Sequence, residues 1–143
     1  MSGRPSSLLS PDRSLHVVER SLPQTLLALI DDLFFSVQVS DTAASLGYEV
    51  VVAHTPGDFA RHLQETPDLV LVDMGVKNTD WARLIREAKA TDRPVIAFGD
   101  HTDLEARQLA LNAGATAVVA NSVVARDLGG LLRKHGKPSS PLA

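Results

Sequence analysis

Short apolar runs recur along the chain, separated by longer segments in which apolar residues return every three or four positions. Five runs are rich in β-branched and aliphatic residues, and this pattern predicts strands. They are Thr25–Ile30, Glu49–Ala53, Leu69–Val72, Pro94–Phe98 and Thr116–Ala120. The runs are continuously apolar rather than alternating, which is typical of strands that helices cover on both faces of a sheet.

The segments between the runs have a helical period. Phe35, Val39, Ala43 and Leu46 share one helical face, and Gly47 stands where a helix end needs a left-handed residue. Four more helices follow from the same reasoning: Asp58–Glu65, Asp80–Ala90, Leu104–Asn112 and Val123–His135. Gly114 marks the end of the third of these, and Ser122 is the predicted cap of the last. Strands that alternate with helices in this way predict an α/β fold built around a parallel sheet.

The chain length predicts one domain. Its 143 residues, 44% of them hydrophobic, suffice for a single core. We expect this domain to span residues 23–135. Residues 1–22 and 136–143 are rich in Ser, Pro and Arg or Lys, and we expect them to be flexible extensions.

Charge and composition narrow the possible functions. The formal net charge is -3 and basic residues are scattered, so a nucleic-acid partner is not expected. There is no cysteine, which excludes disulfides and thiol chemistry. No apolar stretch is long enough to span a bilayer, so we expect no membrane partner and a cytoplasmic location.

Polar residues that follow the predicted strands form the candidate site, because ligands bind at the carboxyl ends of parallel strands. Asp31 and Asp32 follow the first strand, and Asp73 follows the third. Two carboxylates about 4 Å apart repel by roughly 4 kcal/mol at an effective dielectric near 20. We therefore predict that the three aspartates share a pocket and hold a divalent cation, for which Mg²⁺ is the natural choice. The other candidate pocket positions are Gly99, Asp100 and His101 after the fourth strand and Asn121 after the fifth.

A structural interpretation competes with each of these assignments. Asp31 and Asp32 are well placed to cap the next helix. For Asp73 capping is a weaker explanation, because Asn78, Thr79 or Asp80 already offers a cap. His101 is a loop histidine, and most such residues only contact solvent.

Four segments resemble the receiver domain of bacterial response regulators. They are Ile30-Asp31-Asp32, Leu69 to Asp73, Pro94 to Phe98 and Asn112 to Ala115, and the resemblance extends from Thr25 to Lys134. It implies the flavodoxin-like (CheY-like), doubly wound fold with strand order 2-1-3-4-5. The stretch Phe98-Gly-Asp-His is similar to an atypical subgroup of these receivers.

The resemblance also implies roles for individual residues. Asp73 would accept a phosphoryl group from a sensor histidine kinase or another signalling partner. Mg²⁺ would be held by Asp31, Asp32, Asp73 and the carbonyl of Gly75. A partner, or a second copy in a homodimer, would bind the surface formed by the fourth helix, the fifth strand and the fifth helix.

The chain departs from the receiver pattern at several positions. Gly99 stands where receivers carry a hydroxyl residue, Asn121 where they carry a lysine, and Val118 where they carry an aromatic switch residue. Lys77 replaces a proline in the acceptor loop, where its charge could compensate for Asp100.

Three hypotheses follow. The chain is a phosphorylatable single-domain receiver in a phosphorelay, or a phosphorylation-independent pseudo-receiver that acts as an interaction module. The third hypothesis, a ligand-binding or enzymatic domain on a similar scaffold, is disfavoured because no glycine-rich phosphate loop follows the first strand.

Overall fold

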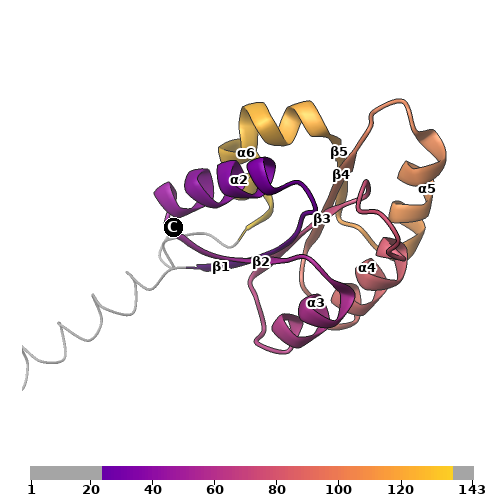
Figure 1. Ribbon diagram of the computed structural model, residues 1–143, viewed down its shortest axis with the longest axis horizontal. Coiled ribbons are helices and arrows are strands. Elements are labelled where there is room, and N and C mark those ends of the chain that lie inside the picture. Colours follow the sequence, from indigo (N-terminus) through magenta and orange to yellow (C-terminus); the bar gives the residue numbers. More distant parts are fainter. Residues whose placement is uncertain (1–23, 137–143) are drawn as a thin grey trace, which may run out of the picture.

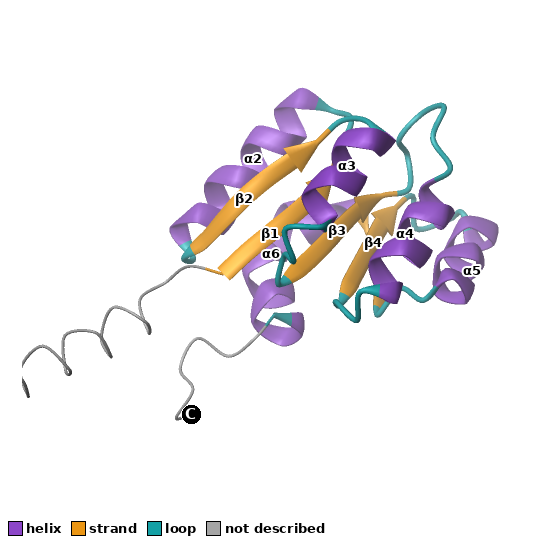
Figure 2. Cartoon of the chain, turned by 90° about the horizontal axis from the view of Figure 1, so that it is seen from below, coloured by secondary structure: helices purple, strands orange, loops and turns teal. Residues whose placement is uncertain are grey.

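The computed structural model describes residues 24–136 and contains a five-stranded sheet with helices on both sides (Figure 1). The strand order is β2-β1-β3-β4-β5, and every neighbouring pair is parallel (Figure 2). This confirms the predicted α/β, flavodoxin-like arrangement. The expectations for residues 1–22 and for the tail from 137 onward lie outside the described residues.

The strands agree with the five apolar runs to within one residue at each end. Their bounds are β1 Gln24–Leu29, β2 Tyr48–Ala53, β3 Leu69–Asp73, β4 Val95–Gly99 and β5 Ala117–Ala120. The central strands β3 and β4 are almost entirely buried, as continuous apolar runs require. The edge strand β5 is half-buried along its whole length.

Five helices connect and follow the strands. They are α2 Leu33–Ser45, α3 Pro56–Leu63, α4 Trp81–Ala90, α5 Leu104–Ala113 and α6 Asn121–His135. Gly47 and Gly114 have φ of 91° and 111°, which confirms the left-handed positions predicted after two of the helices. In the described part of the chain, no helix has the length and apolar content needed to cross a membrane.

The sheet separates two apolar cores. On one face, α2 and α6 pack against alternate residues of the strands, including Leu26, Ala28 and Leu71. On the other face, α3, α4 and α5 cover Leu27, Val70 and their neighbours. The period-2 alternation of strand side chains therefore assigns successive residues to different cores, and both faces of the sheet are buried.

Two details of the predicted helices are wrong. Ser122 does not cap the last helix, because β5 runs directly into α6 and the cap position falls on Ala120, which makes no side-chain bond. Leu46 does not share the buried face of α2. It follows the helix and is 41% exposed.

Candidate functional site

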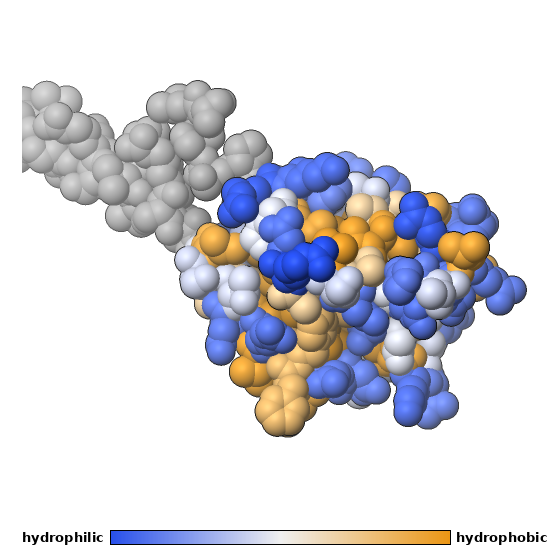
Figure 3. All heavy atoms as spheres, turned by 90° about the horizontal axis from the view of Figure 1, so that it is seen from above, coloured by the Kyte–Doolittle hydropathy of each residue, from blue (hydrophilic) through white to orange (hydrophobic). Residues whose placement is uncertain are grey.

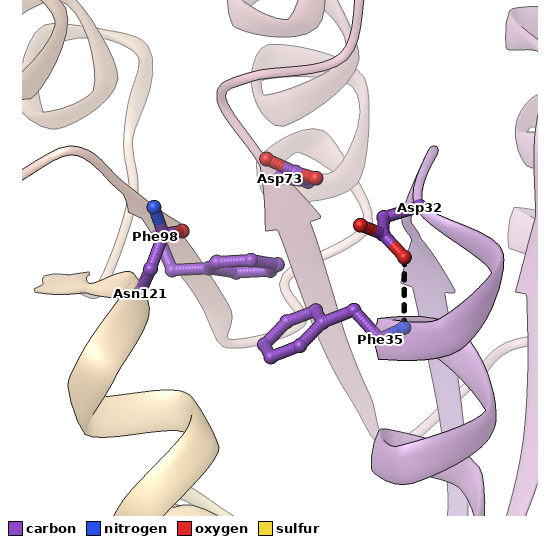
Figure 4. A pocket seen from close by; sticks show the side chains of 5 residues that line it. All are labelled: Asp32, Phe35, Asp73, Phe98 and Asn121. Carbon is purple, nitrogen blue, oxygen red and sulfur yellow. Dashed lines mark hydrogen bonds between the residues drawn. The ribbon is translucent and has the colours of Figure 1, made fainter.

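A pocket of about 240 Å³ opens at the carboxyl edge of the sheet. It is lined by Asp32, Phe35, Asp73, Phe98 and Asn121 (Figure 4). These residues come from the β1–α2 junction, the ends of β3 and β4, and the start of α6. Parallel strands thus bring together side chains that are far apart in the sequence.

Asp73 is the last residue of β3, which lies at the centre of the sheet. The backbone N–H of Gly75 donates to its Oδ1 at 2.7 Å and holds the carboxylate in place. A Cβ at position 75 would lie 3.1 Å from the same oxygen. A larger residue two positions after Asp73 would therefore press on the carboxylate and shift it.

The environment of Asp73 disfavours its charged form. Burial is the largest influence and raises the pKa of the carboxyl group, whereas the backbone N–H groups of Gly75 and Asp31 lower it. The charges of Asp31 and Asp32 raise the pKa further. Negative charge is therefore concentrated here, and a cation would relieve it.

Asp32 has two roles. Its Oδ1 accepts a hydrogen bond from the N–H of Phe35 at 3.0 Å, so it caps α2 as the structural interpretation predicted. The same side chain also lines the pocket, on the side facing Asp73 (Figure 4).

Asp31 is exposed and is not a lining residue of the pocket, but it acts on Asp73. Its backbone N–H lowers the pKa of the Asp73 carboxyl group, and its charge raises it. Among residues 24–136, no group of three or more His, Asp or Glu side chains is arranged to hold a metal ion. Two of the three predicted aspartates, Asp32 and Asp73, line the pocket. Their carboxylate oxygens are the ligand type that Mg²⁺ prefers, so the donor chemistry fits this ion, and the magnesium site stays a prediction.

Two aromatic rings form the apolar part of the pocket, and the sequence analysis did not include them among the candidate site residues. The rings of Phe35 and Phe98 lie 5.5 Å apart between centroids, at an angle of 47°. Phe98 pairs in register with Asp73 across β3 and β4, so both side chains point to the same face of the sheet. Strand register was the signal that could have placed Phe98 in the site.

Gly99 does not line the pocket. A Cβ built on it would lie 2.9 Å from Cε and 3.3 Å from Cβ of Met74. The methionine that follows Asp73 therefore fills the space that a side chain at position 99 would use.

Three further candidates also lie outside the pocket lining. Asp100 and His101 are exposed, and Asp100 accepts hydrogen bonds from the backbone N–H and the hydroxyl group of Thr102 at 2.9 and 2.7 Å. These two bonds lower the pKa of Asp100. Lys77 is exposed in the loop after β3. Of the additional positions, only Asn121 is a lining residue.

Known proteins with similar structures are receiver domains. No family model matches the chain, and no curated protein matches it significantly. A CheY-like response-regulator receiver domain from Methanospirillum hungatei is 26% identical, with a TM-score of 0.70, over 78% of this chain and 92% of that chain.

Two other similar structures contain metal ions. The receiver domain of a sensor histidine kinase from Pseudomonas aeruginosa, with magnesium in its active-site cleft, is 23% identical over 79% of this chain and 97% of that chain. Its TM-score is 0.69. A response regulator from Burkholderia pseudomallei, with a phosphorylated aspartate and calcium, is 17% identical over 83% of this chain and 70% of that chain, with a TM-score of 0.70. Together with the strand order, these similarities show that the chain has the CheY-like fold of response-regulator receiver domains.

Proposed function

We propose that this chain is an atypical receiver module of a phosphorelay, in which Asp73 accepts a phosphoryl group from a histidine kinase. The observation that carries this proposal is the position of Asp73. It ends the central strand β3, borders a pocket and faces a second carboxylate, that of Asp32. A carboxylate so placed is accessible to a phosphodonor and is held in one orientation by the N–H of Gly75.

The acceptor step needs only Asp73 from this chain as the nucleophile. A carboxylate oxygen forms a bond to phosphorus while the bond from phosphorus to the donor nitrogen or oxygen breaks, and the leaving group takes the electron pair. Asp32 and Asp73 would hold Mg²⁺, with Asp31 acting directly or through water and the Gly75 carbonyl as a further ligand. When bound, this ion would neutralise charge on the phosphoryl oxygens.

The similar structures support the proposal. The Burkholderia pseudomallei response regulator contains a phosphorylated aspartate, and the Pseudomonas aeruginosa receiver holds magnesium in its cleft. Receiver domains are signalling modules, which agrees with the expectation that this chain is not an enzyme. A partner surface on α5, β5 and α6 stays a prediction.

The proposal is tested by incubating the protein with acetyl phosphate and Mg²⁺ and measuring its intact mass. We expect one phosphoryl group to be added, and none in Asp73→Asn. Asp41→Asn is a matched control, since Asp41 is an exposed aspartate on α2, and it should be phosphorylated like the parent protein. An unchanged mass at saturating donor would contradict the proposal.

A second candidate, the phosphorylation-independent pseudo-receiver, is favoured by one observation. Position 99 is a glycine, so it offers no hydroxyl group to a phosphoryl group on Asp73, and the side chain of Met74 lies in the adjacent space. The two candidates differ in their response to fluoroberyllate, a phosphoryl mimic. Amide NMR shifts that extend from the pocket into α5 and β5 would favour the receiver, and shifts confined to the pocket would favour the pseudo-receiver.

A further inference from the structure

The pocket combines negative charge with aromatic surface and contains no positive group. Its lining, within the described residues, consists of two carboxylates, two phenyl rings and one amide, with no Lys, Arg or His side chain. Asp58 on α3, by contrast, pairs with the side chain of Arg61. The carboxylates of Asp32 and Asp73 therefore face a cavity whose positive charge must come from another molecule.

The pocket is small. Its volume of about 240 Å³ is below the roughly 300–1,000 Å³ of sites that enclose a whole drug-sized ligand. It is nevertheless several times the roughly 30 Å³ that one water molecule takes up in the liquid. A head group or a single side chain fits this space better than a complete nucleotide or flavin.

The aromatic rings make the pocket more suitable for an organic cation than for a metal ion alone. Phe35 is half-buried and Phe98 is 1% exposed, so Phe35 presents the larger area to a ligand. The ring of Phe98 lies 5.5 Å from it between ring centroids. Ammonium and guanidinium groups are attracted to the faces of such rings, whereas Mg²⁺ takes oxygen ligands and retains its water.

We infer that this pocket binds an ammonium or guanidinium group, which forms ion pairs with Asp32 and Asp73, contacts the ring of Phe35 and donates to the amide oxygen of Asn121. This inference goes beyond the proposed function, because binding does not require that Asp73 accept a phosphoryl group. Such a group could come from a small amine or guanidine, or from a Lys or Arg side chain of a partner protein.

The first test is an NMR titration of the protein with methylguanidinium, without Mg²⁺ or phosphodonor and at constant ionic strength. We expect saturable shifts at the amides of the β1–α2 junction, the end of β3 and the start of α6. Phe35→Leu should weaken binding about threefold to tenfold, because it removes the cation–π contact. Phe34→Leu is the matched control: Phe34 is 90% exposed, does not line the pocket and should leave the affinity unchanged.

A second test addresses the carboxylates rather than the aromatic ring. Asp32→Asn keeps a good helix cap, so α2 stays intact, while binding should weaken about tenfold with the loss of a charge-assisted contact. Mg²⁺ should compete with methylguanidinium, since both would use Asp32 and Asp73. Linear, unsaturable shifts, or equal affinities in the parent and the Phe35→Leu variant, would overturn the inference.

Two peptides distinguish the sources of the cation. A capped Ala-Arg-Ala peptide that binds more tightly than methylguanidinium, while Ala-Gln-Ala does not bind, indicates the side chain of a partner. Equal affinity for the peptide and methylguanidinium indicates a small free cation. The phosphorylation assay is independent of these measurements: its failure alongside saturable methylguanidinium binding would remove the proposed function and leave this inference standing.

Discussion

The two halves of the pocket differ in chemistry although the same sheet builds both. On the side of β1 and β3, Asp32 and Asp73 provide carboxylates, and Gly75 orients one of them. On the side of β4 and β5, the pocket is lined by Phe98 and the neutral amide of Asn121, and the nearby Gly99 lies outside the lining. The first half concentrates negative charge beside the ring of Phe35, and the second adds a buried ring and an amide without a balancing cation.

This difference separates two requirements of the proposed function. The half with carboxylates contains what is needed to attract a cation and to offer a nucleophile. The other half lacks a hydroxyl group or a fixed cation that could respond to a change at Asp73. Apolar surface continues outside the pocket, where Leu33, Phe34 and Val37 of α2 are 70%, 90% and 52% exposed. Apolar side chains also reach the surface on the face of the molecule that carries α2 and α6 (Figure 3).

The largest expected effect comes from Phe98, because its buried ring should stabilise the fold by packing. Phe98→Ala is expected to lower the free energy of unfolding by about 3–5 kcal/mol, because the ring is fully buried. The same change at the exposed Phe34 should cost no more than about 0.5 kcal/mol. Urea denaturation measures both free energies of unfolding. Similar small losses in the two variants would contradict the assignment of Phe98 to the packed core.

The next largest effect tests whether Gly99 and Met74 compete for the same space beside the pocket. Gly99→Thr should cost about 1–2 kcal/mol, because its Cβ would contact Met74 and the methionine side chain must move. In the double variant with Met74→Ala, the total loss should be about 1 kcal/mol smaller than the sum of the two single losses. Additive losses in a double-mutant cycle would mean that the two positions do not compete for space.

The loss of the helix cap at Asp32 should have a smaller effect on the free energy of unfolding. Asp32→Ala should lower the free energy of unfolding by about 1 kcal/mol, since the N–H of Phe35 loses its partner. Asp32→Asn should retain most of the stability because Asn also caps helices. Asp31→Ala is the control, and an equal loss in this variant would contradict the capping assignment.

The smallest expected effect comes from the charge of Asp73. Burial and the neighbouring carboxylates raise its pKa, so the folded state binds the proton more tightly than the unfolded state does. The ionised group therefore lowers stability above its folded pKa, and this cost disappears below the unfolded pKa. Asp73→Asn should raise the melting temperature by a few degrees at neutral pH, and the gain should shrink as the pH falls through this window. A gain that is independent of pH would contradict this assignment.

Sequence periodicity predicted most of the fold, because continuous apolar runs and helical spacing reflect burial on both faces of a sheet. It also placed Asp73 directly after the third strand, and the resemblance to receiver domains implied that this strand is central. It could not show that Asp31, the neighbour of Asp32 in the chain, stays exposed and outside the pocket lining. Nor could it show the break inside α6, where Asp127 has φ of -140° and accepts a bond from the N–H of Gly130. Both features depend on local backbone geometry that residue patterns do not encode.

The central claim is that Asp32 and Asp73 share one pocket in which the chain leaves negative charge uncompensated. The most direct measurement is a pH titration of the Asp73 carboxyl carbon by NMR, with and without Mg²⁺. The account predicts a pKa above the ordinary range for aspartate, and a lower pKa when Mg²⁺ is present, because a bound cation favours the ionised form. An ordinary pKa that Mg²⁺ leaves unchanged would contradict it.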